Sequence, residues 1–191
     1  MADGSYIREM IPDLCSTAFI LECSERPGGV IGYFPETSPI ANAYRGELLG
    51  LMAIYLILLA ANNAWPSLQS GVKVYSDCLR ALKKIVSLSP HRIPSRCRHS
   101  DILKNVMVNC SSLTFKVAYE HVRAQQDDDK EYDTLLRPSH VNCLCDVMTK
   151  GVVWGLAGEE LPRQHMFPLE LVAVFVGDVK LFSNMADNVR F

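Results

Sequence analysis

The sequence predicts an α/β domain built on a mixed five-stranded sheet, with three antiparallel strands followed by parallel strands and helices on both faces. Three observations lead to this prediction. Extended, partly β-branched segments open the chain, a long apolar helix pattern follows them, and short apolar strands then alternate with helix patterns. The expected order is β-β-β-α-β-α-α-β-α.

The first three strands are expected close together in sequence. Residues 3–6 resemble the end of a strand, and residues 16–23 are apolar and partly β-branched. Residues 30–34 follow Gly28-Gly29, which we expect to form a hairpin turn. These three segments therefore predict an antiparallel meander.

The first of these strands is expected to be unusually short. Only Met1 and Ala2 precede Asp3, whereas a central strand usually has about five residues. The strand should therefore lack some backbone partners. This start is what we expect of a truncated piece of a longer polyprotein or of a decayed copy.

A central helix is expected over residues 42–65, because apolar side chains lie almost all round it. Asn62-Asn63 and Pro66 are its stop signals. The uncharged run 48–61 is shorter than the roughly 18 to 20 residues that cross a bilayer. The segment therefore predicts a buried helix and no association with a membrane.

The second half of the domain is expected to alternate strands and helices joined by polar loops. In chain order these are a strand at 72–75, a helix at 79–88, a loop at 90–100, a helix capped by Ser100-Asp101 and ending near Cys110, a strand at 113–122, a mobile loop at 124–138 and a helix at 139–150.

Composition changes after Gly151, so we expect residues 1–150 to form the domain and residues 151–191 a C-terminal appendage or the start of a further module. Residues 169–176 and 179–182 flank Gly177-Asp178, a pair typical of a two-residue hairpin turn. The appendage is therefore expected to contain a β-hairpin.

The charge and the cysteine content limit the partners and the cellular location that we expect. The formal net charge is −2 and the pI is about 6.2, so no global basic field indicates nucleic acid. The seven cysteines form no CxxC pair and lack the spacing of a disulfide framework. Together with the absence of a signal-peptide pattern, this predicts a reduced intracellular protein, cytoplasmic or nuclear and not secreted.

Four acidic residues stand in apolar surroundings: Asp3, Glu47, Asp77 and Asp146. Carboxylates are normally solvated, so acids at strand ends or on the first turn of an apolar helix indicate that something offsets the cost of their burial. Clustered carboxylates are ligands for Mg²⁺, and this is the site we expect. The alternative is a solvated rim of strand-end acids, and Asp146 with Asn142 four residues earlier can equally be a solvated helical pair.

The motifs around these acids resemble those of the ribonuclease H family, particularly the domains of reverse-transcribing elements of the retrotransposon type. They are DGS at Asp3, RxEL at Glu47, YSD at Asp77 and Asn-x-x-x-Asp at Asp146, and the resemblance covers roughly residues 3–150. It implies a ribonuclease H-like fold and endonucleolytic hydrolysis of the RNA strand of RNA/DNA hybrids. It also implies two Mg²⁺ ions, replaceable by Mn²⁺, held by the four acids, and flanking reverse transcriptase domains as partners.

The loop after the last strand departs from the family pattern. The family often carries a histidine there, and this chain carries Gln125, which cannot titrate near neutral pH. His121 or His140 would have to replace it in proton transfer. Two alternatives therefore stay open: a catalytically silent nucleic-acid-binding or assembly module from a truncated retroelement polyprotein, and a related nuclease or integrase with another substrate.

Substrate contacts are expected from residues that flank the acids and from one basic loop. Reading RNA requires hydrogen bonds to 2′-hydroxyls, and phosphates are held by positive charge. The first group is Ser5, Tyr6, Arg45 and Asn142; the second is Arg92, Arg96 and Arg98 with His91 and His99. The acidic run 127–129 is expected to be a solvated loop, and Cys143 and Cys145 are expected to pack in the core.

Overall fold

The computed structural model describes residues 1–24, 26–66, 71–87, 93–94, 97–161, 167, 175–176 and 179–180. Its main sheet has five strands in the order β3-β2-β1-β4-β5, and β1 to β3 are antiparallel whereas β4 and β5 run parallel to β1. The strands are β1 Ala2–Ser5, β2 Leu14–Cys23, β3 Arg26–Thr37, β4 Val72–Ser76 and β5 Val117–His121. The predicted mixed sheet is confirmed.

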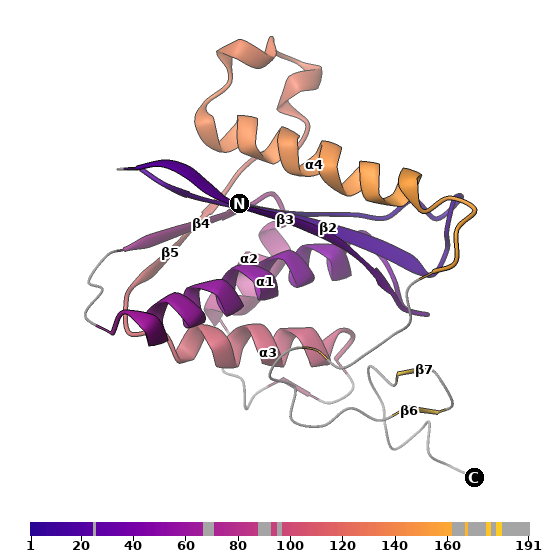
Figure 1. The fold of residues 1–191 in the computed structure, drawn as a ribbon, viewed down its shortest axis with the longest axis horizontal. Helices are drawn as coiled ribbons and strands as arrows, with labels where there is room; N and C mark the ends of the chain where they lie inside the picture. Colours follow the sequence, from indigo (N-terminus) through magenta and orange to yellow (C-terminus); the bar gives the residue numbers. More distant parts are fainter. Residues whose placement is uncertain are drawn as a thin grey trace.

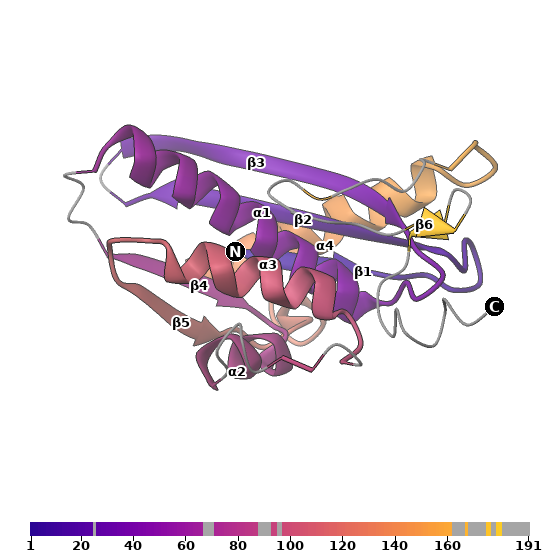
Figure 2. The same ribbon diagram turned by 90° about the horizontal axis from the view of Figure 1, so that it is seen from below.

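Helices cover both faces of this sheet (Figure 1). They are α1 Ala43–Ala64, α2 Leu79–Ser87, α3 Ser100–Ser111 and α4 Arg137–Gly155. Seen from below in Figure 2, α1, α2 and α3 lie in front of the sheet and α4 lies behind it. The predicted order of elements is therefore also confirmed.

Strand β1 is short, as predicted, but it is paired on both sides. It pairs with β2 from Ala2↔Phe19 to Ser5↔Ser16, and with β4 through Ala2↔Ser76. The Met1 ammonium also donates a hydrogen bond to the Ile20 carbonyl at 2.9 Å. The position of the strand is therefore fixed by neighbours on either side.

The predicted turn at Gly28-Gly29 is wrong, because both glycines lie inside β3. Strand β2 pairs with β3 through Glu22↔Gly29 and then Cys23↔Arg26, with an irregularity between them. Gly28 has a φ of 102°, which only glycine adopts without strain. A β-bulge needs such a conformation as much as a turn does, so the glycine pair did not distinguish the two.

Helix α1 lies very close to the sheet because glycines face each other where the two meet. A Cβ on Gly46 would be 2.4 Å from the Ser16 carbonyl oxygen, and a Cβ on Gly4 would be 2.2 Å from the Glu47 amide nitrogen. The side chain of Asn42 caps the helix by accepting a hydrogen bond from the Arg45 amide at 2.9 Å. The first turn of α1 is therefore held directly over β1.

By length and composition alone, α1 could also cross a membrane. In the fold, however, it is a core helix. Leu48, Leu51, Ile54 and Tyr55 are at most 1% exposed, and α1 packs against β1, β2 and α3. This packing agrees with the expected buried helix.

Several predicted boundaries differ from the structure. Strand β5 begins at Val117, later than predicted, and α4 continues to Gly155, past the expected domain boundary. Val153 in this extension is buried with Ile11 and Leu14, so tertiary packing overrides the helix-breaking tendency of glycine. The division of the chain at residue 150 stays a prediction.

The segments after β5 and after α4 are mostly irregular. The loop at 124–136 contains two short 3₁₀ turns, η2 Gln126–Asp128 and η3 Tyr132–Thr134. Two further strands, β6 Phe175–Val176 and β7 Val179–Lys180, pair antiparallel. The expected turn at Gly177-Asp178 lies outside the described residues.

Candidate active site

Three of the four predicted acids converge. One carboxylate oxygen from each of Asp3, Glu47 and Asp77 lies within 4.8 Å of the others. Asp3 and Asp77 meet because β1 and β4 run parallel at Ala2↔Ser76, so the residues that follow lie side by side. The close glycine contact between α1 and β1 places Glu47 over them. We call Asp3, Glu47 and Asp77 the acid cluster.

The hydrogen bonds of the acid cluster leave one oxygen without a partner. The Gly4 amide donates to Asp3 Oδ1 at 2.7 Å, and the Ser76 hydroxyl donates to Glu47 Oε2 at 3.4 Å. Asp77 Oδ1 is buried and accepts no hydrogen bond from any described residue. Buried carboxylate oxygens rarely stay unsatisfied, so this oxygen is available to a ligand.

Burial and the repulsion of neighbouring carboxylates favour the protonated forms of Asp3 and Glu47. Asp3 and Glu47 are only 5% and 6% exposed. Burial, and then the charge of Asp77, raises the pKa of Asp3 to about 7. Burial, and then the charges of Asp3 and Asp77, raises the pKa of Glu47 well above its usual value. A divalent cation would offset both effects, and oxygen ligands at this spacing fit Mg²⁺ or Mn²⁺.

Asp146 is not brought into this group of three. It lies on α4 near the cluster, since its charge contributes to the raised pKa of Asp3. Its Oδ2, however, is 2.6 Å from the Lys150 ammonium, one helical turn later. Asn142, a turn earlier, is buried, and its Oδ1 has no hydrogen-bond partner among the described residues.

The prediction that Arg45 contacts substrate is wrong, because its side chain is fully buried. Its guanidinium donates to Glu36 Oε1 at 2.6 Å and to Asp101 Oδ2 at 3.0 Å. Positions two apart on a helix point about 200° from each other. Since Glu47 faces β1 and β4, Arg45 is directed the other way, toward β3 and α3.

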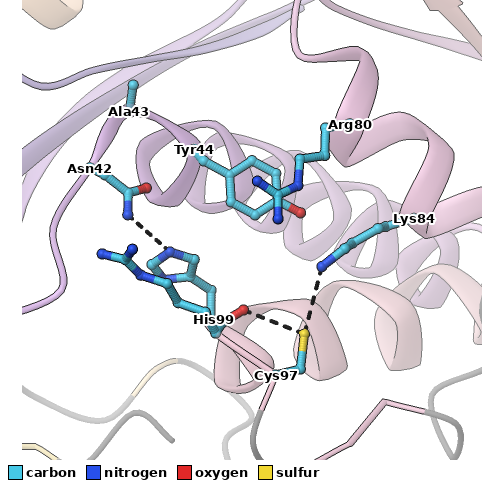
Figure 3. A pocket seen from close by; sticks show the side chains of 8 residues that line it. Asn42, Ala43, Tyr44, Arg80, Lys84, Cys97 and His99 are labelled. Atoms are coloured by element: carbon cyan, nitrogen blue, oxygen red, sulfur yellow. Dashed lines mark hydrogen bonds between the residues drawn. The ribbon is translucent and has the colours of Figure 1, made fainter.

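A second candidate site, the cationic pocket, lies beside the start of α1 (Figure 3). It has a volume of about 420 Å³ and is lined by Asn42, Ala43, Tyr44, Arg80, Lys84, Cys97, Arg98 and His99. Three of these residues carry positive charge and none is acidic. The pocket therefore suits an anion.

Tyr44 is central to the cationic pocket. The Arg80 guanidinium lies 4.9 Å from the centre of its ring and the Lys84 ammonium 5.8 Å. Figure 3 shows both side chains beside Tyr44. The Tyr44 hydroxyl is buried and has no partner in the described part of the chain. Neither Tyr44 nor Arg80 and Lys84 were predicted from the sequence as residues of a site.

The predicted basic loop is only partly described. Arg98 is exposed in the cationic pocket, whereas His91, Arg92 and Arg96 lie outside the described residues. His99 is 1% exposed, and burial, followed by repulsion from Arg45, lowers its pKa to about 3. His99 is therefore neutral, and its expected contribution to a positive phosphate site is wrong.

The remaining predicted contacts are spread around the cluster. Ser5 is half-buried at the end of β1, and the Tyr6 hydroxyl donates to the Pro12 carbonyl at 3.0 Å. Gln125 is exposed, with a left-handed φ of 51°, and no side-chain hydrogen bond joins it to the described residues.

The two alternative histidines differ in position. His121 Nε2 donates to the backbone carbonyl of Asp77 at 2.9 Å, which places this ring beside the acid cluster. His140 instead bonds to the Tyr132 carbonyl and stacks on its ring, with centroids 4.4 Å apart. Of the two, only His121 has a bond to a residue of the cluster.

Two structural expectations are met. The acidic residues at 127–129 are exposed, in agreement with a solvated loop. Cys143 and Cys145 are buried, and all seven cysteines are free. Neither group forms a further site.

A scan against protein-family models finds no match, and a search of the curated proteins finds none either. Among solved structures, the chain is similar to RNase H1 from the halophilic archaeon Halobacterium salinarum NRC-1. The TM-score is 0.47 and the sequence identity is 12%, and the match covers 81% of this chain and 95% of that one.

Proposed function

We propose that this domain is a metal-dependent endonuclease that hydrolyses the RNA strand of RNA/DNA hybrids and leaves 5′-phosphate and 3′-hydroxyl ends. The acid cluster is the observation that supports the proposal most. Three carboxylate oxygens lie within 4.8 Å of one another, and two of them belong to buried acids. A bound cation would offset the repulsion between these carboxylates. When bound, two Mg²⁺ or Mn²⁺ ions would activate the attacking water and stabilise the leaving 3′ oxygen.

Each residue of the cluster has a distinct part in this proposal. Asp3 is oriented by the Gly4 amide, and Glu47 is oriented by the Ser76 hydroxyl. Asp77 contributes the oxygen that has no hydrogen-bond partner. Asp146 would complete the ligand set. Loss of the protons from Asp3 and Glu47 would accompany ion binding, because ligating carboxylates must be ionised.

The cationic pocket would hold a backbone phosphate of the substrate. Arg80, Lys84 and Arg98 attract phosphate by charge, and the Tyr44 hydroxyl lacks a partner that a phosphate oxygen can supply. Arg92 and Arg96 would extend this contact along the strand. The pocket is next to the start of α1, the helix that also carries Glu47, and we propose that one strand contacts both sites.

Recognition of RNA would come from polar groups nearer the acids. The unpartnered Asn142 Oδ1 can accept a hydrogen bond from a 2′-hydroxyl, and Ser5 can offer its own hydroxyl. Tyr6 would contribute its ring, since its hydroxyl already donates to Pro12.

A second candidate function is a nucleic-acid-binding or assembly module without turnover. Two observations favour it: Asp146 is paired with Lys150, and Gln125 cannot carry a proton. The retroelement motifs of the sequence support either version as part of a longer polyprotein with reverse transcriptase domains. We also propose action in the cytoplasm or nucleus, because the spacing of the seven cysteines does not suit a disulfide framework.

The test is cleavage of an end-labelled RNA/DNA hybrid with Mg²⁺ or Mn²⁺. We expect endonucleolytic products, complete loss in excess chelator, and loss in Asp77→Asn. The exposed Asp128→Asn, which makes the same chemical change outside the acid cluster, should cleave like the wild type. Undiminished cleavage by Asp77→Asn would refute the metal assignment, and hybrid binding without any cleavage would favour the silent module.

A further inference from the structure

Lys150 is the one cation of the described residues that is paired with a predicted metal ligand. Its ammonium lies 2.6 Å from Asp146 Oδ2, and the two side chains are 46% and 38% exposed. The hydrogen bond that the Lys150 ammonium donates to Asp146 raises the pKa of Lys150, and attraction from Asp3 and Asp127 adds to it. Lys150 is therefore charged, and its field reaches the acid cluster.

We propose that Lys150 is a positioning residue that competes with the second divalent ion for Asp146. The first ion would bind at Asp3, Glu47 and Asp77, and the second would bind only when the pair between Lys150 and Asp146 opens. This inference rests on the proposed function, because it assumes that the acid cluster is a metal site.

Charge balance supports this order of binding. Four ionised carboxylates neutralise two divalent cations, whereas the Lys150 ammonium beside them leaves the filled site with a net positive charge. The first ion meets a smaller obstacle, because its three ligands already converge and none of them forms an ion pair with Lys150. The second ion must displace the ammonium or share Asp146 with it.

The geometry makes this exchange feasible. Lys150 is partly exposed and is linked to Asp146, one helical turn earlier, by a single hydrogen bond. Partly exposed pairs at this spacing contribute little to stability. The long side chain can therefore swing into solvent when a cation arrives, without any change in the helix.

The experiment measures Mn²⁺ binding in the absence of nucleic acid, by calorimetry and by electron spin resonance of the bound ions. We expect the wild type to bind one ion more tightly than the second. Lys150→Met should raise the affinity for the second ion on the order of tenfold, because it removes both the competitor and the repulsion. The spectrum of two spin-coupled Mn²⁺ ions should then appear at lower concentration.

Two controls separate this role from a general effect of charge or folding. Lys150→Arg keeps the charge and should bind ions like the wild type. Lys73→Met removes an exposed lysine that is 3.9 Å from Glu120, and it should leave the isotherm unchanged. If Lys150→Met folds poorly, Lys150→Gln makes the same test.

Each result decides the question. Equal affinity for the second ion in the wild type and Lys150→Met would overturn the inference, and so would a gain in Lys150→Arg equal to that in Lys150→Met. If the Mn²⁺ isotherms differ between the wild type and Lys150→Met as expected but the wild type cleaves no hybrid, the proposed function is refuted and the role of Lys150 stands. An active wild type with an unchanged isotherm in Lys150→Met would refute the inference alone.

Discussion

The raised pKa of Asp3 predicts that the metal-free protein loses stability as the pH rises. Its folded value is about 7 and its reference value is 3.8. Between these values the folded state binds more protons than the unfolded state, so the free energy of unfolding falls with pH. The stabilising contribution is fully present below pH 3.8 and is lost as the pH passes through about 7.

The size of the effect follows from the same two pKa values. From about pH 5 to about pH 8 the free energy of unfolding should fall by roughly 2.5 kcal/mol through Asp3 alone. Asp3 is only 5% exposed, so solvent does not screen this contribution away. Glu47, whose pKa is raised in the same direction, should add to the loss.

The assay is urea unfolding of the wild type and Asp3→Asn at both pH values in excess chelator. Asparagine keeps the oxygen that accepts from the Gly4 amide but cannot ionise. The stability of Asp3→Asn should therefore fall less between the two pH values, by about 2.5 kcal/mol. The exposed Asp128→Asn should keep the pH dependence of the wild type.

Adding Mn²⁺ at the higher pH provides the complementary measurement. A ligand at a hundred times its dissociation constant stabilises the folded state by about 2.7 kcal/mol. Only the wild type and the Asp128→Asn control should gain this full amount of stability. If the wild type and Asp3→Asn lose equal stability between the two pH values, the electrostatic strain assigned to the acid cluster does not exist.

Three further predictions concern proton transfer, substrate binding and the buried ion pair. Gln125→His should raise the cleavage rate by about 10- to 100-fold with little change in hybrid affinity, measured by single-turnover kinetics; an unchanged pH profile would contradict it. Replacing Arg80, Lys84 and Arg98 by alanine should lower the slope of log affinity against log salt by up to about 0.9 for each phosphate that the variant no longer neutralises, and an equal slope would exclude the pocket from binding. Arg45→Met should destabilise the fold by about 3–5 kcal/mol in urea unfolding, and a loss below about 1 kcal/mol would show that Glu36 and Asp101 do not depend on it.

The sequence was sufficient to predict the sheet, the order of the helices and the three acids that converge. Asp3 lies in the first strand, Glu47 near the start of an apolar helix and Asp77 directly after a strand, and the parallel pairing of β1 and β4 brings Asp3 and Asp77 together. Local patterns determined these features. Predicting them required no knowledge of which distant side chains meet.

Features that depend on distant partners could not be predicted in this way. Arg45 pairs with Glu36, nine residues earlier, and with Asp101, 56 residues later. The cationic pocket likewise joins the start of α1 to α2 and to the segment before α3. In each case the residue type was visible in the sequence, but its direction depended on tertiary packing.

The first turn of α1 explains why one motif led to both a correct and a wrong prediction. In Arg45-Gly46-Glu47 the two charged residues point to opposite sides of the helix, and Gly46 between them presses against β1. The arginine anchors the helix to β3 and α3, and the glutamate completes the acid cluster. A short motif beside an active site therefore does not place every residue of the motif in that site.

The weak point of the candidate site is Asp146 and not the short first strand. Asp3 is paired with Ala18 of β2, its neighbour Ala2 is paired with Ser76 of β4, and the Gly4 amide donates to its carboxylate. These contacts define its position whatever the length of β1. Asp146, by contrast, is shared with Lys150 and lies outside the group of three oxygens. Under the role proposed for Lys150, binding of the second ion depends on how readily a cation takes Asp146 from Lys150.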